Sequence, residues 1–348
     1  MTLGMSDLNR LQVGRPARVP SYRITIAGQR ISPQVGARLQ SLRLTDRRGL
    51  EADQLDIVLE DHDGRLDLPP RGAELQLALG WHGEGLVDRG SYIVDEVEHA
   101  GAPDTLTIRA RSADMREDLP GKRSQSWDRI TVRDIIATIA ERHDLERRVA
   151  DQLGGIRVVH MDQTEESDLH FLTRLAERYD AVATIKNGIL LFLPAGQGTT
   201  AGGLPIPPIQ LRRRAGDIHR YTVTDRDAYT GVRAHWNDTA HARRETVIAG
   251  SDENAKTLRP TYASEQDAID AAQAEWQRIR RGGAEFTLDL AEGMPELYPE
   301  TPVWLIGWKP QIEATPWLIV EVVHSLTDTA YTAALQMEVR NTDQAAPY

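Results

Sequence analysis

Short runs of alternating apolar and polar residues recur in the first and last thirds of this 348-residue chain. "LDIVLED" from Leu55, "AELQLALGW" from Ala73 and "DTLTIRARSA" from Asp104 show the period of two that is typical of strands with one buried face. Turn dipeptides such as Asp63-Gly64 and Pro69-Pro70 separate such runs. Several short strands at this spacing predict a small antiparallel barrel or sandwich.

The two strand-rich regions also match each other in order. "LDIVLED" matches "EFTLDL" near Phe286, and Gly80-Trp81 matches Gly307-Trp308. The run "EVEH" that ends at His99 matches "EVVH" that ends at His324, and "TLTIRA" matches "AALQME". Such matches favour a duplicated barrel, and a trimer of chains with two barrels each presents six similar barrels in a ring.

The middle of the chain has a helical pattern instead. Thr131 can cap a helix that buries Val132, Ile135 and nearby isoleucines, and a second helix is expected from about Ser167 to Tyr179. The segment "AVATIKNGILLFLP" is typical of a hairpin that turns at Asn187-Gly188. A small α/β unit is therefore expected here, and "AGQGTTAGGLPIPP" after it predicts a linker.

These patterns predict an α+β, mainly β chain with two similar small antiparallel β-barrel domains and an intervening α/β domain. The expected boundaries are 1–118 for the first barrel, 119–195 for the α/β domain, 196–210 for the linker and 211–348 for the second barrel. The second barrel is expected to carry one helix, which Ser264 caps.

Composition limits the classes of function. The formal net charge of −11 disfavours a nucleic-acid-binding module, since phosphate contacts dominate that affinity. The basic runs Arg212–Arg214 and Arg278 with Arg280 and Arg281 are therefore interpreted as salt bridges between subunits or as solvated surface. The chain has no cysteine, which excludes disulfides and thiolate chemistry. With neither a signal peptide nor a long apolar run, we expect a protein made in the cytosol that does not insert into membranes.

The stretch "QTEESDLHFLTRLAERYDA" concentrates acidic residues and raises three hypotheses. Glu165, Glu166 and Asp168 could supply the acid and base of a glycosidase, or Asp168 and His170 could bind a metal. Both are weakened because these residues lie close together around the start of one helix. The third hypothesis is a helix start, in which Thr164 or Ser167 caps and the acids complement the helix dipole. The helix start is favoured, and no catalytic, metal or cofactor site is predicted.

Tryptophan is unusually frequent relative to phenylalanine, with seven against three. Trp81, Trp308 and Trp317 lie in expected strands and are interpreted mainly as core residues. They are also the candidate interface residues, since tryptophan is enriched at protein interfaces.

The acidic stretch resembles the Q-x-x-E-S-D-x-x-F-L-x-R-L hallmark of the phage late control protein D family. These are baseplate hub proteins of contractile tails, related to the hub part of type VI secretion spike proteins. Further similar stretches are "GSYIVDEVEHAGAPDTLTIRARSAD", "YTGVRAHW" and "PWLIVEVVHSL". The residues that match the hallmark are Gln163, Glu166, Ser167, Asp168, Phe171, Leu172, Arg174 and Leu175.

This resemblance implies a structural hub without enzymatic activity, in which tube-like barrels form a homotrimer with pseudo-sixfold symmetry. Such a trimer would join a hexameric tail tube to a trimeric spike and form part of the conduit. Baseplate wedge proteins are further implied partners, a tape measure protein is a candidate, and DNA passes only as cargo. The implied location is the tail baseplate of a virion or of a phage-tail-like bacteriocin, assembled in the bacterial cytoplasm.

Two expectations follow for particular parts of the chain. Because the sequence ends at Tyr348 without an OB domain or needle, the spike is expected to be a separate protein. In the family the acidic motif is a mark of the fold, so Glu166, Ser167 and Asp168 are expected to hold the α/β unit against its neighbours.

The alternative function is a cell-wall-degrading tail enzyme that uses the acidic cluster at 165–168.

Overall fold

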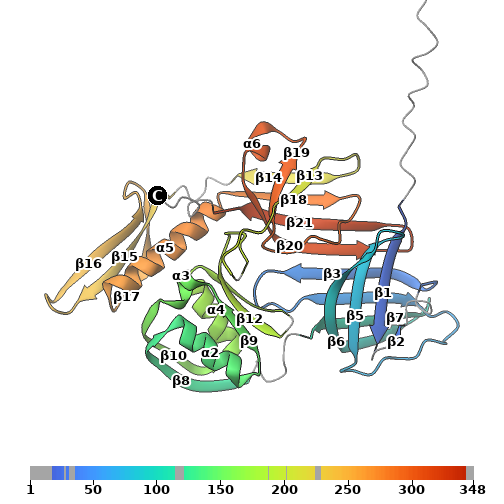
Figure 1. The fold of residues 1–348 in the computed structure, drawn as a ribbon, viewed down its shortest axis with the longest axis horizontal. Coiled ribbons are helices and arrows are strands. Elements are labelled where there is room, and N and C mark those ends of the chain that lie inside the picture. The colour runs from blue at the N-terminus through green and yellow to red at the C-terminus, as the bar shows by residue number, and fades with distance from the viewer. Residues whose placement is uncertain are drawn as a thin grey trace, which may run out of the picture.

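The computed structural model describes residues 18–26, 29–30, 36–113, 121–186, 188–200, 202–223 and 229–341. In this part of the chain strands predominate and form one large sheet and three small ones, which confirms the expected α+β, mainly β class. Figure 1 shows four regions: two groups of strands in the large sheet, a central α/β unit, and a smaller unit that projects to one side. The expected boundary between residues 118 and 119 lies outside the described residues.

The first group of strands, here the first repeat, spans residues 20–112. Its core consists mainly of aliphatic side chains, such as Leu55 and Ile57, on the inward face of the strands. The outward positions are mostly polar, in keeping with the period of two. The strands are β1 (Pro20–Ile26), β2 (Gln29–Arg30), β3 (Leu39–Arg47), β4 (Gln54–Glu60), β5 (Glu74–Trp81), β6 (Leu86–Ala100) and β7 (Thr105–Ser112).

The second repeat lies in residues 209–339 and encloses a core that includes the aromatic residues Phe286, Trp308 and Trp317. Its elements are β13 (Ile209–Arg212), β14 (Ile218–Val223), β18 (Ala284–Leu290), β19 (Pro302–Ile306), the short helix α6 (Pro310–Glu313), β20 (Trp317–Leu326) and β21 (Tyr331–Val339).

The order of strand pairing confirms the internal repeat. Neighbouring strands run β1-β5-β6-β7-β4-β3 in the first repeat and β13-β19-β20-β21-β18-β14 in the second. Each copy has a bulge at the same place, between Val94 and Glu96 and between Ile319 and Glu321. The copies differ at one end, because β1 is antiparallel to β5 whereas β13 is parallel to β19.

The strand ladders refine two of the four sequence matches. Leu75 pairs with Tyr92 in the first repeat, and Val303 pairs with Trp317 in the second. Leu75 therefore corresponds to Val303, and counting along the strands places Gly80 opposite Trp308 in the alignment instead of Gly307. The match between "TLTIRA" and "AALQME" shifts by one residue for the same reason.

The two repeats are joined edge to edge, because β3 of the first pairs antiparallel with β20 of the second. This joint makes one 13-stranded sheet of both repeats. Leu42 lies opposite Leu326 and Leu44 opposite His324, and all four side chains are buried. Figure 1 shows β3 and β20 side by side at the boundary between the blue and red strands.

The central unit spans residues 122–194 and has its own core, which contains Ile135, Ile139 and Phe171. Thr131 caps its first helix as predicted, since its hydroxyl accepts from the backbone N–H of Asp134 at 3.2 Å. The elements are β8 (Lys122–Thr131), α2 (Val132–Arg142), β9 (Glu146–Val149), α3 (Asp151–Gly154), β10 (Arg157–Ser167), α4 (Asp168–Arg178), β11 (Ala181–Lys186) and β12 (Ile189–Pro194). The strands β11 and β12 pair as the expected hairpin, although Asn187 of its turn lies outside the described residues.

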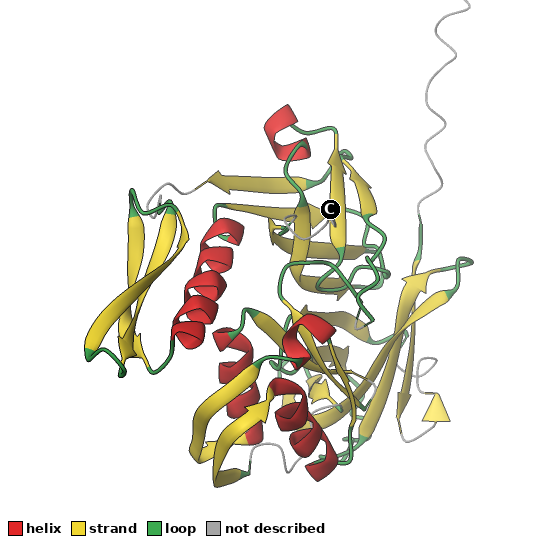
Figure 2. Cartoon of the chain, turned by 60° about the vertical axis from the view of Figure 1, so that its left-hand side comes forward, coloured by secondary structure: helices red, strands yellow, loops and turns green. Residues whose placement is uncertain are grey.

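A projecting unit is inserted between β14 and β18 of the second repeat. It is a three-stranded sheet in the order β16-β15-β17, with one face covered by a helix (Figure 2). Ser264 caps this helix as expected. The elements are β15 (Gly231–Asp238), β16 (Arg243–Gly250), β17 (Ala255–Tyr262) and α5 (Glu265–Arg281).

Candidate functional site: the hallmark motif and the junctions between units

The hallmark motif forms a buried charged network at the start of α4. Ser167 is the N-cap, and its hydroxyl accepts from the backbone N–H of His170 at 3.2 Å. Asp168 follows and is fully buried. Its carboxylate accepts from Arg142 Nη1 at 2.9 Å and from Gln163 Nε2 at 2.9 Å, and it lies 2.7 Å from His143 Nε2. One carboxylate therefore ties α4 to both β10 and α2.

These partners keep Asp168 ionised. Burial by itself raises the pKa of a carboxyl group, but the hydrogen bonds from Gln163, His143 and Arg142 outweigh it. The result is a pKa of Asp168 below its usual range. Arg123 adds a further ion pair at 3.2 Å. A buried carboxylate that holds its charge is suited to positioning backbone elements, and it is unsuited to the role of a general acid.

The other acids of the stretch have separate partners. Glu166 forms a two-pronged ion pair with Arg174, with oxygen–nitrogen distances of 3.1 and 2.6 Å. Glu165 is exposed and exchanges hydrogen bonds with Ser124 at 3.1 and 3.2 Å. A glycosidase needs two carboxyl groups that face the substrate across a cleft. Here each acid is paired with its own neighbour, and Asp168 is shielded from solvent.

The metal hypothesis finds no support in the geometry. His170 is exposed on α4, whereas Asp168 faces inward to Arg142 and His143. Among the described residues, no group of three or more His, Asp or Glu side chains could hold a metal ion. In the same part of the chain, no helix combines the length and apolar character needed to cross a membrane.

The apolar residues of the motif form the core behind this network. Phe171, Leu172 and Leu175 are fully buried in the central unit. The Arg174 guanidinium lies over the Phe171 ring, 5.2 Å from its centroid. The partners of Glu166, Ser167 and Asp168 are all in the central unit, so these contacts hold that unit together internally. Its attachment to the neighbouring units comes from other residues.

One attachment is a junction cluster of charges made of Arg48, Asp180, Arg281, Glu300 and Glu338. Arg281 of α5 bonds Asp180 of the central unit at 2.5 Å and lies 3.2 Å from Glu338 of β21. Glu338 in turn bonds Arg48, which follows β3, at 2.7 Å, and Arg48 pairs with Glu300. The cluster thus links all four units of the fold.

The junction cluster contains three acids and two arginines, so its acidic groups outnumber its basic ones. The pKa of Glu300 reflects this excess. Burial raises the pKa of Glu300, and the nearby charge of Glu338 adds to that effect although Arg48 and Arg281 oppose it. These side chains are partly buried, and Arg281 is the most buried of them, so removing one partner leaves the others with less compensation than solvent alone can restore. The cluster therefore fixes how the units sit against one another.

A second charged cluster joins the first repeat to its neighbours. The Arg89 side chain is completely buried, and it donates to the carbonyls of Pro295 and Leu297 at 3.0 and 3.1 Å. It also pairs with Asp46. Lys186 of β11 pairs with Asp53 and lies 3.5 Å from Asp46. Burial, reinforced by the charge of Asp46, raises the pKa of Asp53 to about 6.

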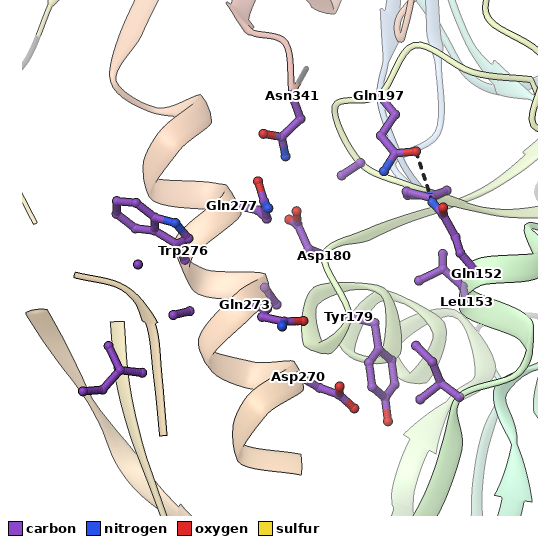
Figure 3. Close-up of a pocket in the computed structure, with 17 residues that line it drawn as sticks. Gln152, Leu153, Tyr179, Asp180, Gln197, Asp270, Gln273, Trp276, Gln277 and Asn341 are labelled. Atoms are coloured by element: carbon purple, nitrogen blue, oxygen red, sulfur yellow. Dashed lines mark hydrogen bonds between the residues drawn. The ribbon is translucent and has the colours of Figure 1, made fainter. Parts of the chain in front are cut away.

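A polar cleft lies between α5 and the central unit (Figure 3). Gln273 and Gln277 of α5 are on one side, and Tyr179 with Asp180 is on the other. Burial raises the pKa of Tyr179 to about 12. The lining consists mostly of amides and apolar groups, and Asp180 is already held by Arg281. The cleft is best described as a seam between units.

The predicted candidate interface tryptophans are all buried within the chain. Trp81 donates to the Gly293 carbonyl at 3.0 Å and packs on Tyr331, so it lies where the two repeats meet. Trp308 and Trp317 belong to the core of the second repeat. The exposed tryptophan is Trp304 of β19, at 56%. The alternation in "PVWLI" could have identified it, since it falls on the face opposite Val303 and Leu305.

The sequence does not distinguish the charged residues that join the units from solvated ones. No local pattern marks the strands or turns that carry Arg48, Arg89 and Lys186. The basic runs are predicted to form salt bridges between subunits or solvated surface, whereas Arg278 and Arg281 form ion pairs within the chain. Arg214 likewise pairs with Glu292.

Comparison with known proteins gives matches over most of the chain. Residues 47–330 match the model of a family described as phage tail baseplate hub (GPD). The probable baseplate hub protein of Escherichia phage 186 is 43% identical, over 93% of this chain and 94% of that protein. The corresponding protein of Escherichia phage P2 is 42% identical, with the same coverage of 93% and 94%.

A solved structure supports the fold independently. The 43 kDa tail protein of prophage MuSo2 from Shewanella oneidensis superimposes with a TM-score of 0.64, over 92% of this chain and 98% of that one. Its sequence identity of 16% is low. The likeness therefore concerns the arrangement of the elements.

Proposed function

This chain belongs to the phage tail baseplate hub family, and from that premise we propose that three copies form a ring that joins the tail tube to the spike. The two repeats of each copy would give the ring approximate sixfold symmetry on the side of a hexameric tube. The opposite side would keep the true threefold symmetry that suits a trimeric spike.

The observation that carries this proposal is the repeated strand order, β1-β5-β6-β7-β4-β3 and β13-β19-β20-β21-β18-β14. Two copies of one sheet arrangement, joined edge to edge, are what a three-chain ring needs in order to present six similar surfaces. The projecting unit is inserted into the second repeat only, so the two repeats are not alike in that region.

We further propose that the hub acts mechanically. It would transmit force from the contracting tail to the spike, and its ring would line part of the conduit through which DNA passes. The junction cluster favours this role, because partly buried ion pairs that link all four units oppose displacement of one unit against another. The net charge of −11 would lower the affinity of the ring for passing DNA.

In the same proposal the acidic motif has a structural role, and the chain has no catalytic role. It names the tube, spike and baseplate wedge proteins as partners, with the tape measure protein as a further candidate. It also places assembly in the bacterial cytoplasm, before the tail is complete.

The decisive experiment is the mass and symmetry of the hub together with its tube and spike partners. We expect three copies in the complex and a ring with six lobes on the face toward the tube. Native mass spectrometry and electron microscopy measure these two properties. A chain that stays monomeric beside both partners would overturn the proposal.

The enzyme alternative needs its own test. The purified hub is incubated with peptidoglycan, and soluble fragments are measured for the wild-type chain and for Glu166→Gln. We expect no release by either. Release that disappears in Glu166→Gln would contradict the structural role.

A further inference from the structure

The joint between the two repeats has a counterpart that the single chain leaves open. Within the chain, β3 docks on the second half of β20. The ladders identify β14 as the counterpart of β3, since each is the last strand in the order of its repeat and they pair with the equivalent strands β18 and β4. The counterpart of the second half of β20 is Glu96–Ala100 of β6, which follows the same bulge.

Both counterpart edges are unpaired in the described part of the chain. β14 ends the order of the large sheet and pairs on one side only, with β18. The ladder between β5 and β6 stops at Ile93, so Glu96–Ala100 pairs on one side only, with β7. An open strand edge presents a row of unsatisfied N–H and C=O groups, which favours pairing with another strand.

We propose that β14 of one copy pairs antiparallel with Glu96–Ala100 of β6 in the next copy, and so repeats between chains the joint that β3 and β20 form within one. The proposal deepens the trimeric hub function and rests on it. The occupant of each open edge is thus a second copy of this chain.

The register of the new joint follows from the register of the observed one. Within the chain Asp46 lies opposite Val322, Thr45 opposite Val323 and Leu44 opposite His324. Moving each residue to its counterpart gives three pairs between copies. These are Val223 with Val97, Thr222 with Glu98, and Tyr221 with His99.

The side chains of these pairs match in face and character. Val97 packs against the core of the first repeat, and Tyr221 packs against the core of the second. Val223 lies on the same face of β14 as Tyr221 and is 61% exposed in the single chain. Pairing would cover this valine with Val97. On the opposite face, Arg220 would lie diagonally across from Glu98, within reach of an ion pair.

The same geometry fixes the type of contact. Each chain offers one β14 edge and one β6 edge, which differ from each other, so the contact is head to tail and a closed ring uses every such edge. The threefold symmetry of the proposed hub closes this ring with three copies. The six joints of that ring would then be three within chains and three between them.

Engineered cysteines test the register directly, because the natural chain contains none. The variant Glu98→Cys with Thr222→Cys is built into assembled tails and oxidised. The products are separated by size under non-reducing, denaturing conditions. We expect crosslinked dimers and trimers of the hub, and no larger species.

Two matched variants serve as controls. Thr45→Cys with Val323→Cys marks the observed joint, and it should crosslink within one chain and leave the monomer mass unchanged. Glu98→Cys with Arg220→Cys shifts one partner by two residues, which moves the Cα atoms to about 7–8 Å and beyond easy disulfide reach. Crosslinks at equal yield in this shifted variant would overturn the proposed register.

The unmodified chain gives a second readout. Hydrogen exchange of peptides that cover 96–101 and 218–223 should slow at least tenfold in assembled tails relative to the isolated chain. Three copies per tail with fast exchange at both segments would overturn this strand pairing while the trimeric hub stands. A copy number other than three would refute the hub function itself, and crosslinked species larger than trimers would overturn the closed ring.

Discussion

The two repeats share a strand order but differ in what covers their edges, and two histidines show the consequence. His324 of β20 and His99 of β6 occupy equivalent positions after the same bulge. His324 is completely buried beneath β3 and bonds the Tyr331 hydroxyl at 2.9 Å. The His99 side chain, with no strand over it among the described residues, is 40% exposed and faces Asp61. Burial at this position thus depends on the neighbouring strand rather than on the repeat itself.

The cores of the repeats differ as well. By the ladders, Trp317 of the second repeat corresponds to Tyr92 of the first. Trp317 packs against Phe286, with ring centroids 5.4 Å apart, whereas the first core is mostly leucine and isoleucine. One backbone arrangement accepts both fillings, because a core tolerates exchange when its volume and its apolar pattern are kept.

The largest expected effect comes from removing the aromatic centre of the second core. Trp317→Ala should lower the free energy of unfolding by about 3–5 kcal/mol, because it leaves a large cavity and an unpaired carbonyl at Ile312. Chemical denaturation measures the loss. The matched variant Trp304→Ala, at an exposed position of β19, should stay within about 0.5 kcal/mol of the wild-type chain. A small loss in Trp317→Ala would assign that residue to an interface instead of the core.

A smaller effect distinguishes the edge of β20 that β3 covers from the equivalent edge of β6, which is open in the described part of the single chain. Val322 is fully buried at the joint, whereas its counterpart Val97 is only partly covered. In the isolated chain Val322→Ala should cost about 2 kcal/mol, for two methyl groups and the cavity they leave, and Val97→Ala less than about 1 kcal/mol. Denaturation of both variants gives the difference. Equal losses would show that β3 contributes nothing to burial at this position.

Assembled tails extend this comparison. If a second copy covers Val97, the loss caused by Val97→Ala should rise toward that of Val322→Ala when thermal stability is measured in the tail. An unchanged loss would mean that the first repeat keeps its open edge after assembly.

Features set by nearby residues could be predicted from the sequence. The alternation of the strands and the caps at Thr131, Ser167 and Ser264 depend on side chains a few positions apart. The hallmark motif likewise predicts a helix start, because its capping residue and its apolar stripe lie within three turns.

The remaining features depend on contacts between distant residues. β3 and β20 meet across more than 270 positions, and an alternating strand does not specify which other strand it will pair with. The charges that join the units are also separated widely, as with Arg48 and Glu338. A lone arginine in a turn is usually solvated, so its burial becomes visible only when its partner is placed beside it.

The buried histidine predicts an effect of pH. Burial, with the nearby charge of Arg89, lowers the pKa of His324 to about 3, whereas an unfolded histidine has a pKa of about 6.5. As the pH falls below 6.5, the unfolded chain takes up a proton that the folded chain refuses, so stability falls until the pH nears 3. Between pH 6.5 and 5.5 this amounts to about 1 kcal/mol. Urea denaturation at several pH values measures it.

The control for this effect is removal of the buried imidazole itself. His324→Gln should remove about 1 kcal/mol of the loss between pH 6.5 and 5.5, whatever its effect at neutral pH. Equal slopes in the wild-type chain and His324→Gln would place the pH sensitivity elsewhere.

The smallest effect concerns the ion pair that crosses the closed joint. Arg47 of β3 bonds Glu321 of β20 at 2.7 Å, whereas the counterpart acid, Glu96, pairs with Arg109 inside the first repeat. Both pairs are substantially exposed, so Glu321→Gln and Glu96→Gln should each cost about 0.2–1 kcal/mol at low salt. In 1 M salt, where charges are screened over about 3 Å, most of this loss should vanish. A loss in Glu321→Gln that persists in high salt would mean that the glutamate acts through packing at the joint. The ion pair would then be a consequence of the pairing of β3 with β20, and the buried apolar side chains of Leu42 and Leu44 would stabilise the joint.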